Sequence, residues 1–338
     1  MAEECFGGID MSNNQDSICT YIAKHKNQEV RMKSRSGAFF VAVSDIILSN
    51  NGCVYGCILD QNNKVIHARA TNKVERDKMC KSKYAQSKIG EIYNLVEKDL
   101  KEKRHVLFSG TGCQVQGLLN YLDVKKVDRS LLSTIDIVCH GVASPRLFRE
   151  YIGFLQKKYH GPVEKFEFRD KTIHGWDDYI ESFVINGKKY KDIKWRGIFN
   201  SDLCLRPSCY ECRFATVNRK SDFTIADAWG IKQADPDFND NRGVSFILAN
   251  SEKAFLMLEE ISDKCEIRQV SLNGYYQGNL KSPTKIKNSR EDFWKLYSKE
   301  GIEGTINEYG NISLKKRIKS YVKYKLRQII QRKKYYLP

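Results

Sequence analysis

Apolar residues recur along the first half of the chain at helical spacing and in short runs, and the two patterns alternate. Small-residue turns such as Asn51-Gly52 separate the segments. The pattern predicts, in chain order, a helix over 36–48, a strand over 53–59, a helix over 88–101, a strand over 105–109, a helix over 114–122, a strand over 135–139, and a helix that Pro145 begins and that ends near His160-Gly161.

Strands that alternate with helices indicate an α/β fold with a mostly parallel sheet flanked by helices. Ligand sites of such folds lie at the carboxyl ends of the strands. After residue 160 the regular alternation of strands and helices ends, and the pattern becomes that of an α+β fold. The strand-like pieces of this second half cover residues 165–169, 179–185, 222–226 and 244–249, with a cysteine-bearing loop among them.

The chain is long enough for a single large domain or for two closely packed subdomains. We expect four segments: an N-terminal extension over residues 1–20, an α/β half over 21–160, a cysteine-loop half over 161–285 and a helical basic tail over 286–338. No linker rich in proline or serine marks the boundary near Gly161.

Charge changes this picture only at the C-terminal end. The net charge of +16 includes ten Lys and Arg residues between Lys315 and Lys334, where no acidic residue occurs. The remainder of the chain is mildly basic, and it carries no zinc-finger, helix-turn-helix or RNA-recognition signature, so we expect no nucleic acid partner.

The same tail has apolar residues at four-residue spacing, namely Leu314, Ile318, Val322, Leu326 and Ile330. Such a basic amphipathic helix can lie on an anionic membrane surface, dock an acidic partner, or pack its apolar stripe on the protein body. The start of the chain has no secretory signal pattern, and no apolar run reaches membrane-spanning length. We therefore expect a cytoplasmic protein, with peripheral membrane contact through Leu314 to Lys334 as an option.

Eleven cysteines are the first chemical clue, because surplus thiols in a cytosolic protein more often bind metals or catalyse reactions than form disulfides. Two residues separate Cys209 from Cys212, so both sulfurs can face one ion or one edge of a cluster. A zinc half-site, a redox dithiol and coincidence are the competing interpretations of this pair.

Two further thiols lie next to predicted strand ends and helix starts. These are Cys113, in Gly110-Thr-Gly-Cys-Gln114, and Cys139, in Ile137-Val-Cys-His-Gly141. Backbone N–H groups and the helix dipole favour a thiolate at such positions. The alternative is that each is a small buried apolar residue, as most free cysteines are.

The motifs in this order resemble the beta-subunit family of coenzyme F420 hydrogenase and formate dehydrogenase. The resemblance extends from about Tyr21 to Asn250. It rests on Lys33 to Phe39, Gly52 to Gly56, Ser82 to Tyr84, Phe108 to Gln114, Asp136 to Gly141 with Ser144-Pro145, Phe168 to Lys171 before Gly175-Trp176, Cys209 to Cys212, and Ser221 to Gly230.

The resemblance implies a flavoprotein whose FAD lies beside one [4Fe-4S] cluster. By position, it implies that the cluster ligands are Cys113, Cys139, Cys209 and Cys212, with Cys204 as the substitute to test. It also implies that the flavin is held by Ser36, Gly37, Ala38, Lys83, Tyr84, Ser109, Gly110 and Thr111. Small residues there allow close backbone approach, and helix starts suit a pyrophosphate.

The chain departs from the family pattern at three places. Ala38 stands where the family commonly has a second glycine, and Gly112 stands where it has a proline. The N-terminal ferredoxin-like module of many relatives is missing, since only Cys5 and Cys19 precede the family core. One cluster is therefore expected, with an external ferredoxin or similar carrier as electron partner.

The resemblance implies an FAD-dependent iron–sulfur oxidoreductase that moves electrons between the flavin and a one-electron carrier. It is closer to a branch associated with polysaccharide genes than to the hydrogenase subunits. A small-molecule or glycan-related substrate is therefore expected rather than the deazaflavin itself, in a role in surface polysaccharide biosynthesis. The alternative is a non-enzymatic protein that binds zinc through the same four thiols.

Four other residues have open roles. Trp176 and Trp229 could stack on a flavin or a planar substrate, although tryptophans near strand turns are more often core or rim residues. His140, beside Cys139, is a candidate proton donor or cluster neighbour, and His174 fits a surface loop equally well.

Overall fold

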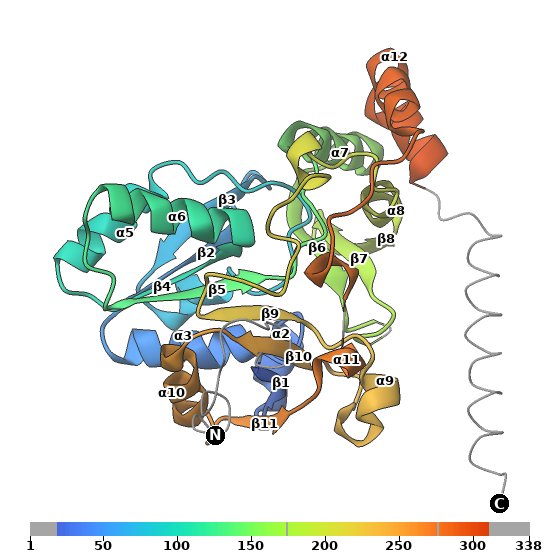
Figure 1. Cartoon of the computed structure of the whole chain (residues 1–338). Coiled ribbons are helices and arrows are strands. Elements are labelled where there is room, and N and C mark those ends of the chain that lie inside the picture. Colours follow the sequence, from blue (N-terminus) through green and yellow to red (C-terminus); the bar gives the residue numbers. More distant parts are fainter. Residues whose placement is uncertain (1–18, 174, 276, 311–338) are drawn as a thin grey trace, which may run out of the picture.

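A large twisted sheet with helices on both faces forms the centre of the protein, and a smaller sheet with its own helices lies beside it (Figure 1). The computed structural model describes residues 19–173, 175–275 and 277–310. Residues 311–338 of the predicted basic tail, most of the N-terminal extension and His174 lie outside the described residues.

The large sheet has eight strands in the order β11-β1-β10-β9-β5-β4-β2-β3. The strands are β1 (Cys19–His25), β2 (Cys53–Leu59), β3 (Val65–Ala70), β4 (Val106–Thr111), β5 (Leu132–Ile137), β9 (Phe223–Asp227), β10 (Ser245–Ala249) and β11 (Cys265–Gln269). Strands β2, β4, β5 and β9 form a parallel block, and β1 runs the same way because β10 is antiparallel to both β1 and β9. Strands β3 and β11 run in the opposite direction. The predicted α/β fold with a mostly parallel sheet flanked by helices is confirmed.

Helices cover both faces of this sheet because each has an apolar side to bury. α3 (Phe39–Ser49) and α10 (Glu252–Glu260) pack on one face, and α5 (Ile92–Lys101) and α6 (Gly112–Val124) on the other (Figure 1). The helix and strand predicted over residues 36–48 and 53–59 are confirmed as α3 and β2. The alternation predicted after residue 88 is also confirmed, as α5, β4, α6, β5 and α7.

The smaller sheet is antiparallel and packs against α7 (Pro145–Tyr159) and α8 (Lys194–Asn200). Its strands are β6 (Val163–Asp170), β7 (Ile180–Ile185) and β8 (Lys188–Asp192), and α12 (Arg290–Tyr309) contacts α7 and α8. Aromatic rings fill the core between them, including Phe148, Phe166 and Trp195. The short helices are α2 (Gln28–Lys33), α4 (Lys73–Asp77), α9 (Ile231–Ala234), α11 (Leu272–Tyr275), η1 (Pro207–Cys209), η2 (Pro236–Phe238) and η3 (Gly278–Leu280).

Strands from both sides of residue 160 share the large sheet, since β9, β10 and β11 join β1 to β5. The division into four segments stays a prediction. Because β1, β4, β5 and β9 run in one direction, their carboxyl ends meet at one edge of the sheet, where ligands of such folds bind. Of the helices that the structure describes, none has the length and apolar character needed to cross a bilayer.

Candidate functional site

A cavity of about 430 Å³ opens at this carboxyl edge, and the four cysteines singled out in the sequence all line it. Cys113 comes from the start of α6, Cys139 from the loop after β5, and Cys209 and Cys212 from the loop that begins with η1. Three segments that are far apart in the sequence therefore bring four thiols to one place.

Local structure fixes the two thiols at the strand ends. Cys113 is the second residue of α6, whose first turn is held by a hydrogen bond from Thr111 N to Gln114 Oε1 of 3.0 Å. Its sulfur lies 3.1 Å from Thr111 Oγ1. Cys139 follows β5 by two residues, in the turn that leads to α7.

The Cys209 loop is tied to the loop after β5 by backbone contacts. Arg206 N donates to Val142 O at 2.9 Å, and Ala143 and Leu205 form an isolated β-bridge. Gly141 allows this approach because its φ is +132° and because a Cβ there would lie 2.8 Å from Leu205 Cδ1. The same Cβ would be 3.4 Å from Cys209 Cβ, so the backbone of Gly141 lies close to one of the candidate ligands.

The thiols are close enough to affect one another electrostatically. Burial, followed by the charges of Cys209, Cys113 and Cys212, raises the pKa of Cys139 to about 12. Burial, followed by Cys212 and Cys113, also raises the pKa of Cys209. These two thiols therefore stay protonated near neutral pH, and a bound metal centre would have to supply the positive charge that turns them into thiolates.

A buried ion pair supports the start of α6. Arg219 Nη1 lies 3.1 Å from Asp136 Oδ2, and both side chains are 2% exposed. A Cβ on Gly112 would lie 2.8 Å from this Nη1 and 3.1 Å from the carboxylate. Gly112 occupies the first helical position of α6. In this chain the glycine makes room for Arg219.

The Ser36-Gly37-Ala38 turn lies at the same edge of the sheet, beside the start of β10. Gly37 N donates to Ser245 Oγ at 3.1 Å, and a Cβ on Gly37 would lie only 2.1 Å from Ala23 O. Ser36 Oγ donates to Val244 O. Ala38 has a left-handed φ of +68°, a conformation that glycine adopts without strain.

Lys83 and Tyr84 have different surroundings. Lys83 Nζ donates to the carbonyls of residues 78–81 at 2.8–3.2 Å, so its ammonium is already bound by the backbone turn that follows α4. Tyr84 stacks on Phe199 with ring centroids 4.6 Å apart, and its hydroxyl accepts a hydrogen bond from Arg169 Nη1 at 2.9 Å. Unlike Lys83, Tyr84 therefore lies beside a cation, Arg169, two of whose nitrogens have no hydrogen-bond partner among the described residues.

Ser109, Gly110 and Thr111 end β4 and begin the turn that carries Cys113. A chain of hydrogen bonds holds this turn: His67 Nε2 donates to Ser109 O, Ser87 Oγ donates to His67 Nδ1, and Gln114 Nε2 donates to Ser87 Oγ. The carbonyl of Ser109 can only accept, so it fixes the direction of every bond in the chain. Because Gln114 Nε2 donates to Ser87, the other end of this amide, Oε1, faces Thr111 N and accepts its hydrogen bond.

The remaining sequence candidates are spread over the fold. Cys204 is 1% exposed in an apolar core, its sulfur lies 3.6 Å from Ile198 O, and it does not line the cavity. His140 lines the cavity and lies 2.6 Å from Asp202 Oδ1. Trp176 is buried and stacks in parallel on Trp229, with centroids 5.3 Å apart.

The sequence pattern alone gave no role to Arg35, Arg169 and Asp227, which form a buried charged cluster beside Tyr84. Arg169 and Asp227 lie at or near the ends of β6 and β9. The sequence signal for Arg169 and Asp227 was a charged residue at the end of a predicted strand, within the motifs Phe168 to Lys171 and Ser221 to Gly230.

Comparison with protein-family models gives a match. The family model for the C terminus of the "Coenzyme F420 hydrogenase/dehydrogenase, beta subunit" matches residues 103–273, which is just over half of the chain and includes all four cavity cysteines. No curated protein gives a match.

A solved structure shares the fold. A chain of the F420-reducing [NiFe] hydrogenase complex from Methanosarcina barkeri, studied by xenon derivatization, superposes with a TM-score of 0.53. Its sequence identity is 14%, over 85% of this chain and 89% of that chain. The match to the family model shows that this protein belongs to the coenzyme F420 hydrogenase/dehydrogenase beta subunit family.

Proposed function

We propose that the protein is an iron–sulfur flavoprotein oxidoreductase that carries one [4Fe-4S] cluster on Cys113, Cys139, Cys209 and Cys212. The observation that carries the proposal is the presence of these four thiols around one cavity at the carboxyl edge of the sheet. Membership in a family of oxidoreductase subunits supports a redox role.

The four thiols are the donor set that a [4Fe-4S] cluster uses, with one cysteine at each iron. They line one cavity of about 430 Å³. The same four thiols would also satisfy tetrahedral zinc, so the metal content of the purified protein distinguishes the two centres.

FAD is the second proposed group, bound along the same edge of the sheet. Its proposed contacts are the Ser36-Gly37-Ala38 turn, Tyr84 and the Ser109-Gly110-Thr111 turn. The first turn lies beside the start of β10 and the last ends β4, and β9 and β5 lie between these two strands. Buried guanidinium nitrogens of Arg35 and Arg169 that have no partner among the described residues fit an anionic neighbour. Lys83 stays a predicted flavin contact, and its ammonium already donates to the carbonyls of residues 78–81.

Together the two groups would supply two-electron chemistry at the flavin and single-electron transfer at the cluster. The residues of this chain supply positions and electrostatics. The α6 N-terminus and the Cys209 loop place the thiols, and the His67–Ser87–Gln114 chain fixes the turn between the two proposed groups. We propose a ferredoxin or similar carrier as electron partner and a small, glycan-related molecule as substrate, in surface polysaccharide biosynthesis.

Anaerobic purification tests the proposal. We expect a brown protein with about four iron and four acid-labile sulfide atoms for each chain and with FAD released on denaturation. Cys209→Ala should lower the iron content to below half. Cys204→Ala and Cys265→Ala are matched controls, because both thiols are buried outside the cavity, and they should keep the iron content of the unmodified protein.

A colourless protein with one zinc for each chain would replace the redox proposal with the structural alternative. A Cys209→Ala protein with unchanged iron content would refute the ligand assignment.

A further inference from the structure

Two buried arginines face a single carboxylate next to Tyr84. The side chains of Arg35 and Arg169 are 9% and 7% exposed, and that of Asp227 is 8% exposed. Asp227 Oδ2 lies 3.3 Å from Arg35 Nη2 and 2.7 Å from Arg169 Nη1. Burial alone would raise the pKa of Asp227, but the two arginines outweigh it and hold this pKa below its ordinary value. One positive charge remains without a counter-charge, and buried charge of this kind is costly.

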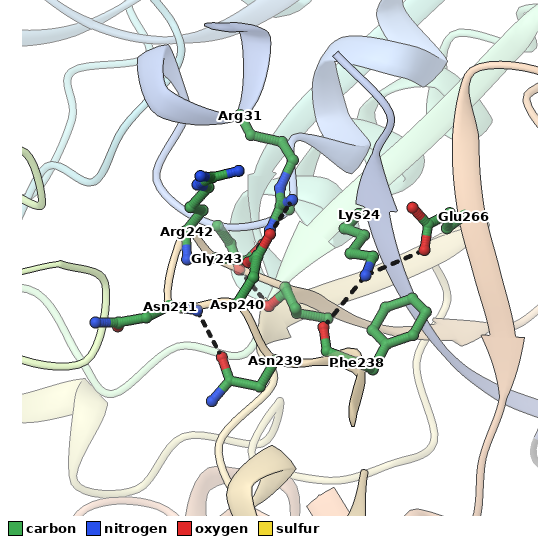
Figure 2. Close-up of polar contacts among 12 residues, drawn as sticks. Lys24, Arg31, Phe238, Asn239, Asp240, Asn241, Arg242, Gly243 and Glu266 are labelled. Atoms are coloured by element: carbon green, nitrogen blue, oxygen red, sulfur yellow. Dashed lines mark hydrogen bonds and ion pairs between the residues drawn. The ribbon is translucent and has the colours of Figure 1, made fainter. Parts of the chain in front are cut away.

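The neighbouring cations belong to the scaffold. Lys171 Nζ donates to the carbonyls of Arg31, Ser36 and Arg242, at 2.5–3.3 Å. Figure 2 shows Arg31 beside Asp240 and Gly243, to which it donates hydrogen bonds. Arg31 is paired with Asp240, and the three N–H groups of Lys171 are taken up by three backbone carbonyls, so Lys171 has no N–H group left for a ligand.

Arg169 has one edge that makes no hydrogen bond. Its Nη1 donates to Asp227 and Tyr84, whereas Nε and Nη2 are buried and have no hydrogen-bond partner among the described residues. Nε and Nη2 form the side-on fork of a guanidinium, whose two parallel N–H groups match a carboxylate or a phosphate. Arg35 Nε is buried and unpartnered in the same part of the protein.

Aromatic rings lie over this guanidinium. The centroid of Tyr179 is 3.8 Å from Arg169 Cζ, and that of Trp229 is 5.3 Å away. Arg196 lies over the same Tyr179 ring at 4.8 Å. Trp229 is 38% exposed and lies flat against Trp176, so the part of its ring that Trp176 and Arg169 leave uncovered is next to solvent.

We propose that this cluster is a binding site for the carboxylate or phosphate group of a ring-bearing ligand. The Nε–Nη2 fork of Arg169 binds the anionic group, Arg35 and Arg196 add positive charge, and Trp229 stacks on the ring. The site lies at the carboxyl end of β9, between the Ser36 turn and Tyr84. This inference rests on the proposed function, which offers two sources of the carboxylate or phosphate group: an anionic substrate and the diphosphate of FAD.

Titration of the full chain with inorganic phosphate and with acetate, by isothermal calorimetry at low ionic strength, tests the site. Arg169→Lys keeps the positive charge and removes the fork, and Arg35→Lys is the second variant in case the first does not fold. Arg268→Lys is the matched control, because Arg268 pairs with Asp235 and Asp237 at a different, more exposed place. FAD and iron contents are measured on every sample, and circular dichroism checks the fold.

If the group comes from the substrate, the unmodified protein and Arg268→Lys bind phosphate or acetate. Arg169→Lys then binds at least ten-fold more weakly with unchanged FAD content. If the group is the diphosphate of FAD, Arg169→Lys keeps its iron content and loses most of its FAD, and phosphate binds only after FAD is removed. Equal anion binding and equal FAD content in folded Arg169→Lys and the unmodified protein would overturn the site. A purified protein without iron would refute the redox proposal but leave the phosphate titration interpretable.

Discussion

Replacing Arg219 with methionine should destabilise the protein strongly although the substitution preserves most of the side-chain volume. Arg219 and Asp136 form an ion pair in which both side chains are 2% exposed. Water cannot solvate Asp136 once its partner is gone, and breaking such a buried pair costs about 3–5 kcal/mol. The expected loss in the free energy of unfolding is therefore several-fold larger than the roughly 1 kcal/mol of an exposed pair.

Urea denaturation of the anaerobically purified chain measures this loss. The double variant Arg219→Met with Asp136→Asn removes the orphaned charge, and it should recover more than half of the stability that the single variant loses. Arg146→Met is a control, because the Arg146 side chain, which pairs with Glu150, is 70% exposed. A loss below about 1 kcal/mol for Arg219→Met would show that Asp136 is solvated or neutral in the folded protein, and it would refute the reasoning.

Two further predictions concern the turn that carries Cys113. Thr111→Val removes the hydroxyl that lies 3.1 Å from the Cys113 sulfur. Because hydrogen bonds to ligand sulfurs stabilise the reduced form, this variant should make the reduction potential of the proposed cluster more negative in an anaerobic redox titration. Thr111→Ser should leave the potential unchanged, and equal potentials in all three proteins would contradict the assignment. Burial lowers the pKa of His67 to about 4, below the value of about 6.5 in the unfolded chain, so the unfolded state binds the proton first as pH falls. The free energy of unfolding should therefore fall by about 3 kcal/mol between pH 6.5 and pH 4, relative to that of His67→Gln. If the free energies of unfolding of the two proteins changed in parallel with pH, His67 would not be buried as a neutral ring.

The sequence allowed the secondary structure to be predicted wherever the signal is local. The strand over residues 53–59 follows an Asn-Gly turn, and its bounds agree with β2. The bounds of α3 and α5 start later than predicted, because the segments before them form turns whose φ angles or hydrogen bonds depend on distant residues. Gly37, for example, packs against Ala23 and Ser245.

Pairing between distant residues is what the sequence did not reveal. The approach of the Cys209 loop to the loop after β5 depends on contacts such as Arg206 N to Val142 O. The sequence shows charged residues at Arg169 and Asp227 but not that they meet, nor that Lys83 folds back onto carbonyls of its own turn. The resemblance suggested which thiols belong together, and the fold shows the segments that place them around one cavity.

The arrangement of the thiols has a consequence for how the protein matures. From Cys113 to Cys212 the chain closes a loop of about 100 residues, so a centre bound to all four sulfurs would act as a cross-link that restricts the unfolded chain. The thiols come together only after β4, β5 and the Cys209 loop have taken their places. Insertion of the inorganic centre would then be a late event that locks a topology already formed, and loss of that centre would loosen both sides of the sheet edge at once.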